Sequence, residues 1–403
     1  MKYAVILMDG MADEPIEALN GLTPLAYAKT PTIDEIAVRS TIGMVHTIPE
    51  GCAKGSDTAN LSVLGYNPQK YYFGRSPLEA LSMGVSLKES DVTFRTNVVT
   101  LSEEEEYENK IILDHSADEI TTEEASELIA AVEEALGNEA CKFYPGVSYR
   151  HLLVWDKGSR EVQLTPPHDI LEKCIRDYKP QGDHAEEIWD LMKKSYDILK
   201  DHPVNIARKA KGLRPANSIW IWGEGIKPRL PLFEEKYHVE GAVISAVDLI
   251  KGIGIGAGMT SIDVEGATGN VHTNYKGKAD AAIKWLIEDN KDYVYVHLEG
   301  PDECGHRNEM DNKVKAIELI DEKIIKPIKA ALDASGEAYK ILVLPDHPTP
   351  LRLRTHTGDP VPYMIYESGN GIVNKANQYT EEFAATTGAD IEEGYTLMDQ
   401  FLG

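Results

Sequence analysis

Three largely apolar runs constrain the fold of this chain more than any other feature. They are Tyr3 to Met8, Tyr293 to Leu298 and Ile341 to Leu344. A strand that is apolar on both faces is typical of a parallel sheet covered by helices on both sides. Two helical patterns, Lys278 to Glu288 and Lys313 to Leu332, can provide such cover. The sequence therefore predicts an α/β fold with a mainly parallel sheet.

Side chains with metal-binding chemistry follow each of these runs. They are Asp9 after the first run, Asp302 and His306 after the second, and Asp346, His347 and His356 after the third. Any single one is explained equally well by a turn-forming Asp or a surface His. The carboxyl ends of parallel strands, however, lie at one edge of the sheet. Asp or His side chains after all three runs would therefore lie close together, which favours a metal site. Asp and neutral His are usual ligands of Zn²⁺ and Mn²⁺.

This ligand set is too large for one tetrahedral zinc and suits two cations. In two-metal sites the ions lie roughly 3.5–4 Å apart and clamp the attacking and leaving oxygens of a phosphoryl displacement. Ser56 is the candidate nucleophile, because the small-residue turn from Gly51 to Asn60 opens a helix whose free N–H groups can bind an anion. The alternative for Ser56 is a helix N-cap, which the local sequence alone favours.

The region from 76 to 205 has a different character. Strand patterns at Asp91 to Val99 and Val147 to Trp155 alternate with amphipathic helices, one of which begins at a capping box, Thr121 to Glu124. We expect this region to be a smaller α+β domain inserted into a core domain formed by residues 1–75 and 206–403. A chain of 403 residues is long enough for two cores.

Composition excludes several classes of partner. The formal net charge of -25 argues against nucleic acid or an anionic membrane surface. The four cysteines form no C-x-x-C pair, and no apolar run is long enough to span a bilayer. We expect a cytoplasmic monomer or small homo-oligomer that acts on a small molecule. The Gly and Ile alternation from Gly252 to Gly258 is too incomplete to indicate a dinucleotide site.

Several motifs together resemble one family. They are Met8 to Asp13, Lys54 to Ser62, Ala216 to Trp220, Gly266 to Gly269, Val296 to Asp302 with His306, Asp346 with His347, and His356 with Asp359 to Pro362. In this order they resemble the archaeal-type cofactor-independent, that is 2,3-bisphosphoglycerate-independent, phosphoglycerate mutases of the alkaline phosphatase superfamily. The resemblance implies a three-layer phosphatase-like core with a mobile inserted domain, a phosphoserine intermediate, and two divalent ions (Mn²⁺ or Zn²⁺, with Co²⁺ or Mg²⁺ as further choices).

The resemblance also implies roles for individual residues. One metal would be held by Asp302, His306 and His356, and the other by Asp9, Asp346 and His347 with Ser56. Ser56 would take the phosphoryl group of 3-phosphoglycerate and return it to the 2-hydroxyl, without added 2,3-bisphosphoglycerate. The candidate substrate-binding residues are Asp114, Arg150, Arg214 and Lys251.

The stretch from Leu113 to Asp118 departs from the family pattern. It keeps Asp114 but lacks the arginines and the glycine expected after it. This leaves the acceptor open, so a second hypothesis is phosphotransfer to another small alcohol such as homoserine, or a phosphatase. A third is a non-catalytic protein that binds metal or a phosphometabolite, which predicts metal binding without a phosphoserine.

Overall fold

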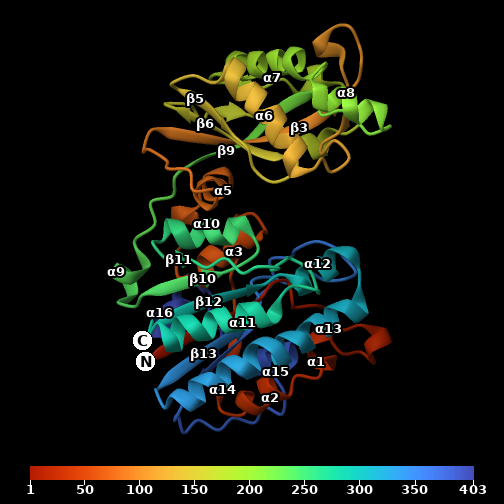
Figure 1. Ribbon diagram of the computed structural model, residues 1–403. Coiled ribbons are helices and arrows are strands. Elements are labelled where there is room, and N and C mark those ends of the chain that lie inside the picture. Colours follow the sequence, from red (N-terminus) through yellow and green to blue (C-terminus); the bar gives the residue numbers. More distant parts are fainter. The chain divides into compact units, whose positions relative to one another are not determined.

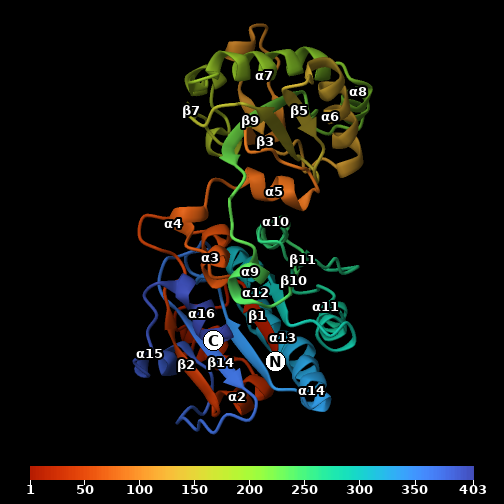
Figure 2. The ribbon, with the colours of Figure 1, turned by 90° about the vertical axis from the view of Figure 1, so that its left-hand side faces the viewer.

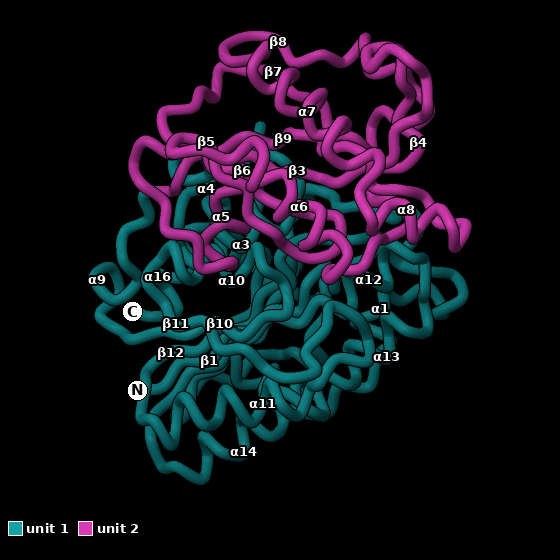
Figure 3. The backbone as a smooth tube through the Cα atoms, turned by 45° about the horizontal axis from the view of Figure 1, so that its top comes forward, with its two compact units in different colours: residues 1–72, 229–403 teal, residues 73–228 magenta.

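The computed structural model describes residues 1–403, which divide into two compact units. Unit 1 comprises residues 1–72 and 229–403, and unit 2 comprises residues 73–228 (Figure 3). The chain thus returns to unit 1 later than the expected residue 206. The reason is that the strand β9 (Ser218–Ile226), which lies within the range expected for the core domain, pairs along its length with β3 (Asp91–Leu101) of unit 2.

Unit 1 is built on a seven-stranded sheet of order β11-β10-β12-β1-β13-β14-β2. Its strands are β1 (Lys2–Met8), β2 (Ser40–Val45), β10 (Gly241–Ile244), β11 (Thr260–Ser261), β12 (Tyr293–Leu298), β13 (Tyr339–Leu344) and β14 (Val361–Glu367). All neighbouring pairs are parallel except the two that β14 makes with β13 and β2. The prediction of a mainly parallel sheet is confirmed. The central β1 is buried along its whole length, which explains its apolar sequence.

Helices cover both faces of this sheet (Figures 1 and 2). The alternate residues Ala4, Ile6 and Met8 of β1 share a core with a long helical rod that runs from residue 310 to 335. Tyr3, on the other face, packs its ring edge-on against Phe401. The helices of unit 1 are α1 (Pro24–Tyr27), α2 (Pro31–Ala37), α3 (Ser56–Val63), α4 (Pro68–Tyr71), α9 (Phe233–Tyr237), α10 (Asp248–Gly256), α11 (Tyr275–Ile283), α12 (Gly300–Arg307), α13 (Met310–Ile320), α14 (Lys326–Ser335), α15 (Glu381–Thr386) and α16 (Leu397–Leu402).

Unit 2 contains an antiparallel five-stranded sheet of order β4-β3-β6-β5, with β9 paired to β3. Its other strands are β4 (Ile112–Asp114), β5 (Cys141–Tyr144) and β6 (Arg150–Asp156), and a separate ribbon joins β7 (Val162–Gln163) to β8 (Gln181–Gly182). The helices are α5 (Ser76–Ser82), α6 (Thr122–Leu136), α7 (Ala185–Leu199) and α8 (Pro203–Ala210). The Thr121 side chain caps α6 as expected, since it accepts a hydrogen bond from the Glu124 amide. Across both units, no helix combines the length and the apolar character needed to cross a bilayer.

Candidate metal centre

Three adjacent strands deliver the candidate ligands to one edge of the unit 1 sheet. Because β12, β1 and β13 are neighbours and parallel, the residues that follow them lie side by side. Asp9 directly follows β1, Asp302 lies in the first turn of α12 after β12, and Asp346 follows β13 by two residues. The topology thus brings together residues that are more than 290 positions apart in the sequence.

The first cluster consists of Asp302, His306 and His356. The helical i, i+4 spacing in α12 places Nε2 of His306 3.2 Å from Oδ2 of Asp302. Nε2 of His356 lies 3.4 Å from Oδ1 of the same carboxylate and 2.9 Å from Nε2 of His306. Both histidines therefore direct Nε2 toward one point beside one carboxylate.

The opposite ring nitrogen of each histidine is held by the backbone. Nδ1 of His306 lies 3.0 Å from the carbonyl oxygen of Arg354, and Nδ1 of His356 lies 3.0 Å from that of Lys54. A carbonyl accepts only from N–H, so this contact assigns the proton to Nδ1. Nε2 is then the nitrogen that can bind a cation once it carries no proton, which is the usual arrangement in metal-binding histidines.

The second cluster consists of Asp9, Asp346, His347 and Ser56. Nε2 of His347 lies 3.6 Å from Oδ1 of Asp9 and 3.3 Å from Oδ2 of Asp346. The Ser56 hydroxyl oxygen lies 3.1 Å from the same Nε2. The two carboxylates and the imidazole are almost completely buried.

His347 lies at the boundary between the two clusters. Its ligand atom is within 4.8 Å of those of Asp9 and Asp346, and also of those of Asp302 and His356. The His347 and His356 rings stack with centroids 3.9 Å apart. The structure therefore brings together all the predicted ligands, but it does not separate them as cleanly as the division expected from the resemblance.

Burial and charge make the two clusters suitable for divalent cations. Burial raises the pKa of Asp9 well above its usual value, and the negative charges of Asp346 and Asp302 raise it further. Oδ1 of Asp9 is also buried without a hydrogen-bond partner. Buried carboxylates crowded in this way require positive charge, and Asp with His supplies the mixed ligand set that Mn²⁺ and Zn²⁺ accept. The residues present fit two such ions.

Ser56 is the first residue of α3 and does not act as its N-cap. That position belongs to Gly55, and no side chain caps the helix. The Ser56 hydroxyl contacts His347, so the N-cap interpretation that the local sequence favours is wrong. Placed at the helix N-terminus, the hydroxyl lies where the helix dipole and free N–H groups favour a phosphoryl group.

Two further side chains that the sequence analysis missed hold the carboxylates in place. Nε2 of His297 lies 2.9 Å from Oδ2 of Asp9, and burial lowers the pKa of His297 to about 3. Asn60 donates from Nδ2 to Oδ2 of Asp346 at 2.9 Å and to the Ser56 carbonyl at 2.8 Å. Asn60 could have been found from its i+4 spacing to Ser56, whereas His297 is hidden inside an apolar strand.

Two of the predicted substrate-binding residues pair with each other in unit 2. Nη1 of Arg214 lies 3.1 Å from Oδ2 of Asp114 and also donates to the carbonyl of Leu113. Asp114 accepts hydrogen bonds from the amides of Ser116 and Asp118 as well. Both side chains are thus engaged in fixing their own loop.

The other two predicted substrate-binding residues have different surroundings. Lys251, on α10 of unit 1, forms an ion pair with Asp263 at 2.6 Å. Arg150, on β6 of unit 2, is exposed and lies over the ring of Tyr149, 5.0 Å from its centroid. The exposed Arg150 also lies near a second cation, Arg95.

Arg150 belongs to a group of cations and aromatic rings that the sequence analysis missed. Arg95 of β3 lies 4.2 Å from the ring centroid of Trp222, and His168 meets the same ring edge-on at 5.3 Å. Burial lowers the pKa of Arg95, Glu79 opposes this shift, and the nearby charges of Arg75 and Arg150 lower it further. Arg75 and Arg95 both pair with Glu79, and Arg150 adds a third guanidinium near Arg95, which leaves a local excess of positive charge in a strongly acidic chain.

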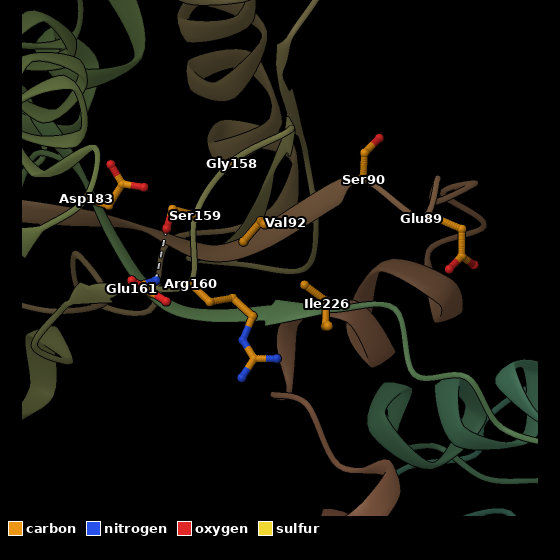
Figure 4. A pocket seen from close by; sticks show the side chains of 9 residues that line it. All are labelled: Glu89, Ser90, Val92, Gly158, Ser159, Arg160, Glu161, Asp183 and Ile226. Atoms are coloured by element: carbon orange, nitrogen blue, oxygen red, sulfur yellow. Dashed lines mark hydrogen bonds between the residues drawn. The ribbon is translucent and has the colours of Figure 1, made fainter.

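One hollow of unit 2 lacks such an excess of positive charge. Figure 4 shows it lined by Arg160 together with Glu89, Glu161 and Asp183. The Glu161 amide donates to the Ser159 hydroxyl at 3.1 Å and closes the turn beside Arg160. Because the carboxylates outnumber the single guanidinium, this hollow is not suited to an anion.

Comparisons with known proteins agree on one family. The model of 2,3-bisphosphoglycerate-independent phosphoglycerate mutase matches residues 37–205. A probable enzyme of that name from Geobacter sulfurreducens is 48% identical over 402 residues, covering 100% of both chains. One from Methanosarcina barkeri is 51% identical over 385 residues, covering 95% of both.

Solved structures give the same result. The cofactor-independent phosphoglycerate mutase of Thermoplasma acidophilum superposes with a TM-score of 0.70 at 28% identity, covering 100% of this chain and 99% of that one. A Pyrococcus horikoshii protein superposes with a TM-score of 0.81 at 31% identity, covering 100% of this chain and 96% of that one.

Proposed function

The chain belongs to the family of 2,3-bisphosphoglycerate-independent phosphoglycerate mutases, and we propose that it interconverts 3- and 2-phosphoglycerate through a phosphoserine formed on Ser56 beside two divalent cations. The family membership confirms the resemblance read from the sequence and places the activity in glycolysis and gluconeogenesis. The observation that supports the mechanism best is the 3.1 Å contact of the Ser56 hydroxyl with His347, inside the cluster that contains Asp9 and Asp346.

The reaction has two balanced halves. The Ser56 oxygen forms a bond to phosphorus while the ester bond to the 3-oxygen of the substrate breaks, and that oxygen receives a proton. The glycerate then turns, its 2-hydroxyl attacks the phosphoserine, and Ser56 regains its hydroxyl. When bound, the cations supply charge neutralisation for the phosphoryl oxygens and lower the pKa of the Ser56 hydroxyl. Asp9, Asp346 and His347 would hold one ion, and Asp302, His306 and His356 the other.

We assign the substrate carboxylate to Arg150, supported by Arg95. A guanidinium can bind a carboxylate through two parallel hydrogen bonds. The local excess of positive charge around Trp222 also favours the binding of an anion there. Lys251 remains a candidate for the phosphoryl oxygens. Asp114 and Arg214 neutralise each other and in this proposal support the loop. The relatives' names support phosphoglycerate rather than homoserine as the substrate.

We further propose a cytoplasmic location for a monomer or small homo-oligomer, and manganese or zinc as the ions. The four free cysteines suit a reducing compartment. The activity is tested by conversion of 3- to 2-phosphoglycerate by protein loaded with manganese, in the absence and presence of 2,3-bisphosphoglycerate. Turnover that does not depend on the added bisphosphate is expected. Metal-loaded protein without turnover would overturn the proposal.

Replacing Arg150 by alanine should lower kcat/KM by roughly 10- to 100-fold, because a charge-assisted pair contributes about 1.5–3 kcal/mol. Arg150→Lys should recover only part of this, since an ammonium cannot bind a carboxylate in the same two-point geometry. Arg160→Ala, in the acidic hollow of Figure 4, is the matched control and should leave kcat/KM unchanged. Steady-state kinetics on the three variants would contradict the assignment if Arg150→Ala behaved like the control.

Cation binding should release protons and strengthen as the pH rises. The hydrogen bond and charge of Asp302 raise the pKa of His306 to about 9 in the metal-free protein. At pH 7 His306 thus carries a proton that must leave before Nε2 can bind a metal, and metal affinity should fall as the pH is lowered below 9. Titration calorimetry at pH 7, in buffers of different ionisation enthalpy, should report at least one released proton. The same count for His306→Ala as for the wild type would contradict the assignment.

A further inference from the structure

The segment from Asp346 to His356 carries candidate ligands of both clusters, so its conformation sets the distance between them. It does not form a helix or a strand of its own. Pro348 instead forms isolated bridges with Met11 and Ala12, in the loop that follows β1. The segment makes one internal turn, in which the amides of Leu353 and Arg354 donate to the carbonyl of Pro350, but its position relative to the two clusters depends on contacts from outside it.

A fully buried ion pair supplies these contacts. The side chains of Lys313, on α13, and Asp13 are 0% and 1% exposed, and their Nζ and Oδ2 atoms lie 2.8 Å apart. Lys313 also donates to the carbonyl of Thr349 at 2.9 Å. Oδ2 of Asp13 accepts from the amide of Leu351 at 3.1 Å. The pair thus binds the segment at two backbone positions, a carbonyl and an amide.

The bound stretch touches both clusters directly. The hydroxyl of Thr349 donates to Oδ1 of Asp302 at 2.5 Å and lies 3.2 Å from Nδ1 of His347. Three residues after Leu351, the carbonyl of Arg354 meets Nδ1 of His306. Two of these three contacts reach ligands of the cluster that contains Asp302, so this cluster depends more on the segment.

We propose that Lys313, acting through Asp13 and Thr349, is a positioning residue that sets the separation of the two cations and chiefly secures the ion held by Asp302, His306 and His356. This inference rests on the two-cation site of the proposed function. A fully buried ammonium keeps its geometry because moving it away from its carboxylate would leave two buried charges unpaired. The contacts of Lys313 with Asp13 and with the Thr349 carbonyl then hold the segment in a fixed position relative to α13.

Lys313→Met removes the ammonium but keeps the length of the side chain. Because it leaves the Asp13 carboxylate buried and unpaired, this variant can lose stability for reasons unrelated to the metals. The double variant Lys313→Met with Asp13→Leu removes both charges and restores an apolar pair of similar size. Lys284→Met, which breaks an exposed pair with Asp289, is the matched control.

The measurement is Mn²⁺ binding, followed by calorimetry for the number and affinity of the ions and by electron paramagnetic resonance for their magnetic coupling. In the wild type and the control we expect two ions with a coupled spectrum. In the double variant we expect one ion bound roughly 10- to 100-fold more weakly and the coupling lost, while the melting temperature recovers toward that of the control. If the Lys313–Asp13 pair served stability alone, the double variant would recover the melting temperature and the coupled binding of two ions together.

Two results would overturn the inference. Double-variant protein that binds two ions with wild-type affinities and a coupled spectrum would show that the pair does not position the segment. Wild-type protein that binds fewer than two ions would overturn the two-cation site and the inference together. Asp13→Asn, which keeps the contact of Lys313 with Thr349, provides a milder test and should weaken the same ion by a smaller factor.

Discussion

Replacing Ser56 by alanine should abolish mutase turnover, with a loss on the order of 10⁶-fold, as when a covalent nucleophile is removed from other enzymes. The reason is that the Ser56 hydroxyl, at the first residue of α3, is the proposed nucleophile and contacts His347 beside Asp9 and Asp346. Folding should be unaffected, because Gly55 and not Ser56 occupies the N-cap of α3. The wild type incubated with 3-phosphoglycerate and quenched in acid should show one phosphorylated peptide containing Ser56, and the variant none.

Metal counting separates this result from loss of the cations. Ser56→Ala should still bind two ions, since Asp9, Asp346 and His347 remain around one of them. Ser126→Ala is the matched control, because that hydroxyl bonds only to the carbonyl of Thr122 on α6. A variant that keeps even a hundredth of wild-type turnover would contradict the phosphoserine mechanism. So would phosphopeptide mapping that finds the phosphoryl group on another side chain.

The shared position of the candidate ligands at one edge of the sheet was predictable, because Asp9, Asp302 and Asp346 each come after a strand whose pattern is local. The runs before Asp9 and Asp346 are apolar at every position, and the run before Asp302 is apolar except at His297. This pattern identifies central strands of a parallel sheet, and adjacency of their ends then follows from topology. The first half of β9, from Ile219 to Trp222, is also apolar, yet this strand pairs with β3 in unit 2. An apolar run shows that a strand is buried but does not identify its partner, and for this reason the boundary at 206 was wrong.

The supporting contacts escaped prediction for a different reason. Lys313 lies in a helix whose pattern assigns it no particular role, and its partner Asp13 is 300 residues away. Arg95 and Trp222 come from two strands of unit 2 that meet only through their pairing. Contacts of this kind depend on which elements pack together, and a single sequence carries no signal of it beyond the apolar pattern itself.

The charge of the chain bears on how it can bind its substrate. A net charge of -25 repels an anion at long range, but this repulsion is screened beyond about 8 Å at physiological ionic strength. Within that distance the two cations would dominate the local field at Ser56. We therefore expect the acidic surface to reduce the rate of encounter more than the affinity once the substrate is bound.

Replacing His356 by alanine should remove one cation and leave the other. The variant loses an Nε2 that lies 3.4 Å from Asp302 and 2.9 Å from Nε2 of His306, so the ion at these residues should bind roughly 100-fold more weakly or be absent. Asp9, Asp346 and His347 stay in place around the other ion. Elemental analysis after dialysis should find one metal per chain, and turnover should fall with the lost ion. His272→Ala, on the exposed surface of unit 1, is the control and should retain two.

His347→Ala should behave differently, because His347 belongs to both groups of possible ligands. It lies with Asp9 and Asp346 in one group, and with Asp302 and His356 in the other. Its loss should weaken both ions, whereas the loss of His356 weakens one, although the two rings stack against each other. The two variants together test whether the short segment from Asp346 to His356 divides its ligands between two sites. Equal loss of both metals from His356→Ala would show that the clusters form a single cooperative site, and equal loss of one metal from each variant would show that His347 serves only one ion.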